Sequence, residues 1–204
     1  MRVVGGEARG RPLKGPKHEG TRPIIDRVKT ALFDILSWHI EDTRFLDLFA
    51  GVGGVGIEAI SRGAARAAFV ELDQGTYKIL GENLASTRLG DRAETLRMDA
   101  FAFLASAHAQ GRHFDYVYVA PPQYHGLAAR ALAQLDRAPL TEPGGTAIVQ
   151  IHPRERSDLG TLTLTTFTLS DERRYGNTLL MFYQHRAPSP PRADAPGAAQ
   201  ESQL

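Results

Sequence analysis

One segment, in which a strand runs directly into a glycine-rich turn and then a helix, constrains this chain most. Residues 45–56 read Phe-Leu-Asp-Leu-Phe-Ala-Gly-Val-Gly-Gly-Val-Gly. The apolar run is typical of a buried strand, and the glycines let the backbone approach a ligand closely. Gly51, Gly53 and Gly56 match the spacing of a dinucleotide-binding loop, and Glu71 follows at the distance where an acid holds a ribose. A nicotinamide enzyme is therefore one interpretation of this segment.

Two acidic residues favour a different ligand. Asp47 ends the first strand, four residues before Gly51, where a dinucleotide-binding protein normally has an apolar residue. A carboxylate at this position can meet the ammonium of a methionine moiety. Asp99 follows a later strand and can accept a hydrogen bond from an adenine amine; it is equally well placed to cap the next helix, and the two roles are compatible. Together the acids favour S-adenosylmethionine.

A proline pair marks a possible second half of the site. Residues 119–124 read Val-Ala-Pro-Pro-Gln-Tyr at the end of a predicted strand. Pro121 and Pro122 stiffen the backbone and donate no N–H, which leaves nearby carbonyls free to accept from a substrate amine. Two prolines can also simply end a strand. The pair indicates a functional site only because it is expected at the same end of the sheet as the glycine loop.

Short apolar runs alternate with helical patterns through the middle of the chain. This alternation predicts an α/β, Rossmann-like fold with a mostly parallel central sheet and helices on both faces. Strands are expected near 44–49, 67–72, 92–97, 114–119 and 145–151, and helices near 23–38, 54–62, 74–87, 99–109 and 125–135. Two final strands, at 161–169 and 178–183, should form an antiparallel hairpin because the polar connection 171–177 is too short for a crossover helix.

The first of these helices should have one apolar face. Its spacing follows the i, i+3, i+4, i+7 rule, and we expect Trp38 to complete that face by packing in the core. The residues on the predicted face are Val28, Ala31, Leu32, Ile35 and Leu36.

Length and composition predict the domain boundaries and exclude several kinds of site. The 204 residues predict one domain at 23–186, with a basic extension at 1–22 that can form a small hairpin, and a disordered tail at 187–204. There is no cysteine, which excludes disulfides and cysteine-ligated metals, and the seven histidines have no metal-ligand spacing, so we expect no metal site. Without an apolar run long enough for a bilayer or a secretion signal, we expect a cytoplasmic protein without membrane contact.

Positive charge gathers at the amino terminus. Residues 1–30 hold eight Lys or Arg against three Asp or Glu. Such a segment suits a polyanionic backbone, although a merely solvated leader has the same composition. The candidates for contact with a polyanion are Arg9, Arg11, Lys14, Lys17, Arg22 and Arg27, with Arg173, Arg174 and Tyr175 in the C-terminal connection.

At this point the chain resembles the RsmD-type methyltransferases, which methylate a guanine N2 in bacterial 16S ribosomal RNA. The resemblance covers residues 1–184, and the block from Thr-Arg-Pro at 21–23 to Ala-Leu-Phe at 31–33 is its most specific part. Further matches are Arg-Pro-Leu at 11–13, Leu-Asp-Leu-Phe-Ala-Gly at 46–51, Gly-Ile-Glu-Ala at 56–59, Ser-Arg-Gly-Ala at 61–64, Phe-Val-Glu at 69–71, Glu-Asn-Leu at 82–84 and Tyr-Gly at 175–176. A nicotinamide enzyme has no reason to contain the first block.

The resemblance implies a class I S-adenosylmethionine-dependent methyltransferase fold and a role for each matching residue. Phe49, Ala50, Gly51 and Gly53 are expected to wrap the methionine part of the cofactor near Asp47. Glu71 is expected to hold the ribose hydroxyls, with Leu72 next to it in the cofactor site. Asp99 and Ala100 are expected to meet the adenine, and Arg22, Pro23 and Arg27 to close the site from the N-terminal side. It also implies the small ribosomal subunit as partner and a monomeric protein.

One departure from the family pattern concerns the reaction itself. The family usually has Asp or Asn, two prolines and an aromatic residue, whereas this chain has Ala120, Pro121, Pro122 and Gln123, with Tyr124 one place late. A guanine amine gains positive charge as it attacks the methyl group, so a fixed acceptor stabilises the transition state. Losing one such hydrogen bond costs about 2.7–4 kcal/mol. We therefore expect an active but acceptor-poor enzyme, with a catalytically weakened RNA-binding or assembly protein as the alternative.

Overall fold

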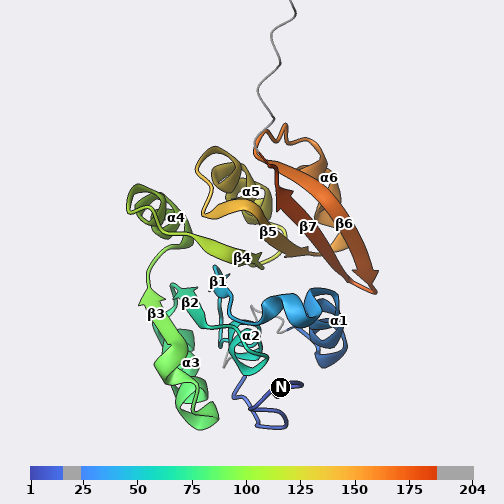
Figure 1. Ribbon diagram of the computed structural model, residues 1–204. Helices are drawn as coiled ribbons and strands as arrows, with labels where there is room; N and C mark the ends of the chain where they lie inside the picture. Colours follow the sequence, from blue (N-terminus) through green and yellow to red (C-terminus); the bar gives the residue numbers. More distant parts are fainter. Residues whose placement is uncertain (16–23, 188–204) are drawn as a thin grey trace, which may run out of the picture.

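The computed structural model describes residues 1–15 and 24–187 and contains one seven-stranded sheet in the order β3-β2-β1-β4-β5-β7-β6 (Figure 1). The first five strands are parallel, and β7 runs antiparallel to both β5 and β6. The strands are β1 (Arg44–Asp47), β2 (Arg66–Glu71), β3 (Ala93–Arg97), β4 (Phe114–Val119), β5 (Thr141–Ile151), β6 (Phe167–Tyr175) and β7 (Thr178–His185). The predicted parallel sheet and C-terminal hairpin are confirmed.

Helices cover both faces of the sheet, as the alternating pattern predicts. One core lies between the sheet and α1 (Asp26–Leu36), α2 (Gly56–Ser61) and α3 (Gln74–Thr87); the other lies under α4 (Ala100–Ala109), α5 (Leu127–Arg137) and α6 (Arg156–Gly160). Figure 1 shows the first three helices in its lower part and the last three in its upper part. Successive strand residues alternate between the cores: Phe45 packs in the first and Leu46 in the second.

The expectation for Trp38 is wrong. The helix ends at Leu36, because Ser37 adopts a positive φ of 46°, and a short 3₁₀ turn, η1 (Ser37–Ile40), follows. The change of direction leaves Trp38 70% exposed, stacked on His39, and buries Ile40 instead.

The predicted apolar face of α1 is confirmed for Val28, Leu32 and Leu36, which are buried, but it is wrong in part. Ile35 is exposed, and Lys29 and Phe33 are buried. Lys29 can lie in the core because its Nζ pairs with the equally buried Glu58 at 3.2 Å and donates to the Arg2 carbonyl at 2.6 Å. A buried lysine is tolerated only with such partners.

The first strand of the C-terminal hairpin begins and ends later in the sequence than predicted. Residues 161–166, predicted as strand, precede β6, and 171–175, predicted as connection, belong to it, so that the turn is only Gly176–Asn177. The buried Asp136 carboxylate accepts the N–H groups of Thr165, Thr166 and Phe167, which fixes the chain before the strand begins. Because β6 is the sheet edge, its second half tolerates polar residues.

Three other elements depart from the sequence expectation. β5 begins at Thr141, four residues before the predicted start, and the 3₁₀ turn η3 (Pro153–Glu155) and helix α6 were not predicted. A further 3₁₀ turn, η2 (Gly90–Arg92), leads into β3.

The amino-terminal segment packs on the domain. Arg2 and Pro12 form an antiparallel bridge, and Val3, Ala8 and Leu13 are buried in the same core as α1, α2 and α3. Lys17, Arg22 and Pro23, and the predicted tail from residue 188 onward, lie outside the described residues. Within the described ranges no helix is long and apolar enough to span a membrane.

Candidate active site

The predicted site residues meet at the carboxyl edge of the sheet. The chain passes from β1 outward through β2 and β3, then returns to place β4 on the other side of β1. In such a sheet, ligands bind in the crevice where the strand order reverses. The glycine loop follows β1 and the proline loop follows β4, so the two loops emerge from neighbouring strands.

The glycines of the first loop have different surroundings. Gly51 has a φ of +54°, and a Cβ built on it meets nothing within 4 Å. Gly53 has a φ of +87°, but a Cβ there would lie 2.4 Å from Leu80 Cδ1, and one on Gly56 would lie 2.3 Å from the Phe69 ring. Gly51 therefore borders open space where a ligand can approach the backbone, whereas Gly53 and Gly56 allow the loop and helix to pack closely.

Glu71, at the end of β2, holds this loop in place. Its Oε2 accepts the N–H of Gly51 at 2.9 Å, and its Oε1 accepts the N–H of Asp73 at 2.7 Å. Each carboxylate oxygen keeps a further lone pair, so the same group can also accept from ribose hydroxyls. Leu72, beside it, is largely exposed.

Asp47 lies beneath the loop and is 2% exposed. Its Oδ2 accepts the N–H of Gly56 at 2.9 Å. Burial, reinforced by the negative charge of Glu71, raises the Asp47 pKa to about 7, against the lowering effect of the Gly56 hydrogen bond. A buried carboxyl group with a raised pKa favours a nearby cation, because the positive charge offsets the cost of ionising the carboxyl.

Asp99 caps α4, as one of its two predicted roles requires. Its Oδ1 accepts the N–H groups of Phe101 and Ala102, both at 2.9 Å. The ring of Phe49 meets Phe101 edge-on at 6.1 Å, and the Arg130 guanidinium covers Phe101 at 3.7 Å. Ala100 is buried. The glycine loop and α4 thus form one apolar wall beside the Asp99 carboxylate.

The proline loop is held by residues that the sequence reasoning missed. Tyr124 has a positive φ of 66°, which is strained for a non-glycine residue, and its N–H donates to Glu155 Oε1 at 2.9 Å. Glu155 is buried in η3 and also accepts the His152 N–H at 3.3 Å. The rings of Tyr124 and His152 lie 5.4 Å apart, and Tyr124 is 60% exposed. The signal was present: His152 and Glu155 have capping-box spacing directly after a predicted strand.

Asn83 connects the amino-terminal segment with the glycine loop. Its buried amide donates to the carbonyls of Val52 and Lys14 and accepts the Lys14 N–H at 2.8 Å. Glu58, on α2, accepts the N–H groups of Val4 and Gly5. The basic segment is therefore attached to the loop that forms the site.

The predicted RNA contacts divide into two groups. Arg9, Lys14 and Arg27 lie on the amino-terminal side and are exposed; Lys14 pairs with Glu82, and Arg11 donates to the Ser86 carbonyl. On the hairpin, the exposed Arg173 pairs with Asp171 at 2.9 Å, Arg174 donates to the Gly176 carbonyl, and Tyr175 is half-buried. In the residues described here, no group of three or more His, Asp or Glu side chains could hold a metal ion.

The strand order separates the two cofactor interpretations. A dinucleotide-binding sheet has the order 3-2-1-4-5-6, whereas here the antiparallel β7 lies between β5 and β6. A family model described as "Conserved hypothetical protein 95" matches residues 1–184. Over 195 residues, 95% of this chain and 94% of the relative, the chain is 34% identical to ribosomal RNA small subunit methyltransferase D of Escherichia coli K12. The chain belongs to the RsmD family.

Two solved structures of methyltransferases or putative methyltransferases match the same fold. The putative methyltransferase yhhF of Escherichia coli matches with a TM-score of 0.77 and 32% identity, covering 92% of this chain and 99% of that one. An RNA methyltransferase of Salinibacter ruber, in complex with S-adenosyl-L-homocysteine, matches in fold with a TM-score of 0.64 at 15% identity, over 85% of this chain and all of that one. The strand order and these matches favour the S-adenosylmethionine interpretation over the nicotinamide interpretation.

Proposed function

We propose that this protein transfers a methyl group from S-adenosylmethionine to the exocyclic N2 of a guanine in 16S ribosomal RNA, within the assembled small subunit. The observation that carries the proposal is that β1 and β4 pair in parallel and end at the same edge, each followed by one half of the site. The glycine loop supplies the donor side and the proline loop the acceptor side. Its RsmD relatives, named small subunit rRNA methyltransferases, support the substrate class.

The donor side fits S-adenosylmethionine. Gly51 borders open space, and the buried Asp47 lacks a cationic partner among the described residues. We assign the methionine part to the loop and Asp47, the ribose to Glu71 with Leu72, and the adenine to Asp99 with Ala100. When bound, this cofactor supplies a methyl group on a sulfonium centre. The loop residues that wrap it are Phe49, Ala50, Gly51 and Gly53.

The acceptor side must hold a guanine amine in line with that methyl group. Fixed positioning of donor and acceptor supplies a large share of the rate enhancement. Ala120 has no side-chain acceptor, so the carbonyls of Ala120 and Pro121 and the amide oxygen of Gln123 accept hydrogen bonds from the amine, while Pro122 keeps the loop stiff. The nitrogen–methyl bond forms as the methyl–sulfur bond breaks, and the nitrogen then loses one proton to water. Tyr124, exposed and clamped by Glu155, offers a stacking surface for a guanine turned out of its helix.

The exposed arginines of the two groups described above, together with Lys14, supply the contact to the RNA backbone. The protein acts as a monomer in the cytoplasm, where its substrate is assembled. Because phosphate contacts release counterions, affinity for the particle should fall steeply with salt, whereas affinity for the cofactor should not.

The direct test is transfer of tritium from labelled S-adenosylmethionine to small-subunit particles isolated from cells that lack this protein. The expected product is N2-methylguanosine after nuclease digestion. Large-subunit particles from the same cells are the matched control. If cofactor and particle both bind but no label is transferred, the protein is the assembly factor that the missing acid at Ala120 otherwise suggests.

A further inference from the structure

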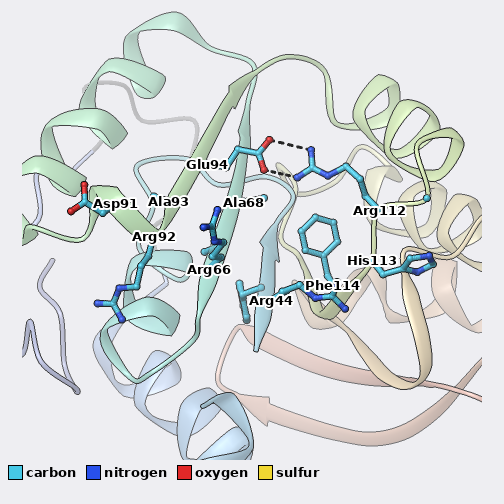
Figure 2. Close-up of a pocket in the computed structure, with 13 residues that line it drawn as sticks. Arg44, Arg66, Ala68, Asp91, Arg92, Ala93, Glu94, Arg112, His113 and Phe114 are labelled. Atoms are coloured by element: carbon cyan, nitrogen blue, oxygen red, sulfur yellow. Dashed lines mark hydrogen bonds and ion pairs between the residues drawn. The ribbon is translucent and has the colours of Figure 1, made fainter. Parts of the chain in front are cut away.

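A charged pocket lies at the amino ends of the parallel strands, opposite the candidate active site. Its volume is about 300 Å³, and its walls are the amino ends of β1, β2, β3 and β4 (Figure 2). Strands rise about 3.3 Å per residue, so the six residues of β2 place this pocket about 17 Å from the candidate active site. None of the residues assigned above to cofactor or guanine lines it.

Four arginines from four segments surround the pocket. Arg44 begins β1, Arg66 begins β2, Arg92 directly precedes β3, and Arg112 lies just before β4. Parallel strands start at one edge, so their first residues come together there. The lining carboxylates are Asp91 and Glu94, so that the lining carries two more positive than negative charges.

Arg66 differs from the other three. Arg44 pairs with Asp115 at 3.8 Å, Arg92 pairs with Glu7, and Arg112 binds Glu94 with two hydrogen bonds. In the described part of the chain, Arg66 makes no ion pair. Figure 2 shows Arg66 between Arg92 and Arg44, as the order β3-β2-β1 requires.

The walls favour a compact anion over further protein packing. Ala67, Ala68 and Ala93 are among the residues that line it, and none of them carries a side chain long enough to reach across the pocket. The Arg112 guanidinium is fixed over the rings of Phe103 and Phe114, at 5.3 and 5.5 Å, so it loses little freedom on binding.

We propose that this pocket binds a phosphate group, with Arg66 as its central contact. The existing ion pairs are partly exposed, and exposed pairs contribute little stability, so a phosphate can compete with their carboxylates. Guanidinium groups bind phosphate through paired hydrogen bonds. If the proposed function holds, the phosphate belongs to the RNA backbone, and the protein contacts its substrate at both edges of the sheet; a free phosphate compound has the same chemistry.

The test compares Arg66→Ala with Arg137→Ala in the full chain. Arg137 ends α5, is exposed and lies outside the pocket, so its loss removes the same charge. Binding of a labelled single-stranded RNA is measured over a salt series, and binding of inorganic pyrophosphate by calorimetry. Affinity for S-adenosylmethionine is measured for both variants as well. Because the cofactor side lies at the carboxyl ends of the strands, neither substitution should change this affinity, and an unchanged value shows that the variant is folded.

We expect Arg66→Ala to weaken RNA binding several-fold and to reduce the slope of log affinity against log salt by about 0.7, the loss of one phosphate contact to a single strand. Arg66→Lys should keep the slope. A loss confined to pyrophosphate identifies a free phosphate compound as the occupant and supports the pocket. If Arg66→Ala behaves like Arg137→Ala with both probes, the proposal is overturned, whatever the outcome for methyl transfer.

Discussion

Replacing Asp47 by asparagine tests the electrostatics of the donor side. The asparagine Oδ1 can still accept the Gly56 N–H, but the side chain can no longer ionise. In the folded parent the Asp47 pKa is about 7, against an ordinary value of 3.8. Between these values the folded protein holds a proton that the unfolded chain has released, so this group lowers stability as the pH rises, until both states are ionised above about pH 7.

The gap between the two pKa values corresponds to about 4 kcal/mol of stability lost by pH 8, of which only about 1–2 kcal/mol is already lost at pH 5. Asparagine carries no such loss. The free energy of unfolding of the variant minus that of the parent should therefore increase by about 3 kcal/mol from pH 5 to pH 8. Any constant cost of fitting the amide cancels in this difference.

Urea unfolding followed by circular dichroism at both pH values measures the effect, with Asp158→Asn as the control because Asp158 is exposed on α6. A difference that stays constant from pH 5 to pH 8 would refute the account of Asp47. Calorimetry adds a second check. Binding of S-adenosylmethionine to the parent should strengthen from pH 5.5 to 7.5, because a cation favours ionised Asp47, and in Asp47→Asn this strengthening should disappear.

Six further variants test the two loops. Gly51→Ala should weaken cofactor binding at least tenfold and cost about 1 kcal/mol of stability. Gly53→Ala should cost clearly more stability in the same urea assay, because its Cβ meets packed side chains. Equal stability costs would contradict the assignment of open space to Gly51. Glu155→Ala should lower the single-turnover methylation rate about tenfold with cofactor affinity unchanged, and Glu155→Gln should recover part of it, since the amide oxygen still accepts a hydrogen bond. Gln123→Ala should slow methylation without affecting cofactor affinity, and an unchanged rate would exclude a role for Gln123. Ala120→Asp should accelerate methylation, because it supplies the absent acceptor.

The parts of the fold that repeat a local pattern could be predicted from the sequence. α3 occupies the predicted residues 74–87, and the acids Asp47, Glu71 and Asp99 end strands or begin helices as their spacing indicates. These features depend on hydrophobic periodicity and turn chemistry within a few residues, which are properties of the local sequence.

The errors have non-local causes. Lys29 pairs with Glu58 and donates to the Arg2 carbonyl, and both partners are far from it in the sequence. These two contacts make a lysine acceptable in the core. β6 is polar along its second half because it is an edge strand, and edge position is a property of the whole sheet. Likewise, the role of Glu155 depends on β5 ending beside the proline loop, which becomes visible only once the sheet is assembled.

The central claim, that the two loops jointly transfer a methyl group to a guanine amine, is tested most directly in cells. Mass spectrometry of nuclease-digested 16S ribosomal RNA, from strains with and without this protein, should show one N2-methylguanosine that disappears in its absence and returns on complementation. It should not return with a Gly51→Ala, Asp47→Asn double variant. An identical set of modified guanines in both strains would contradict the account.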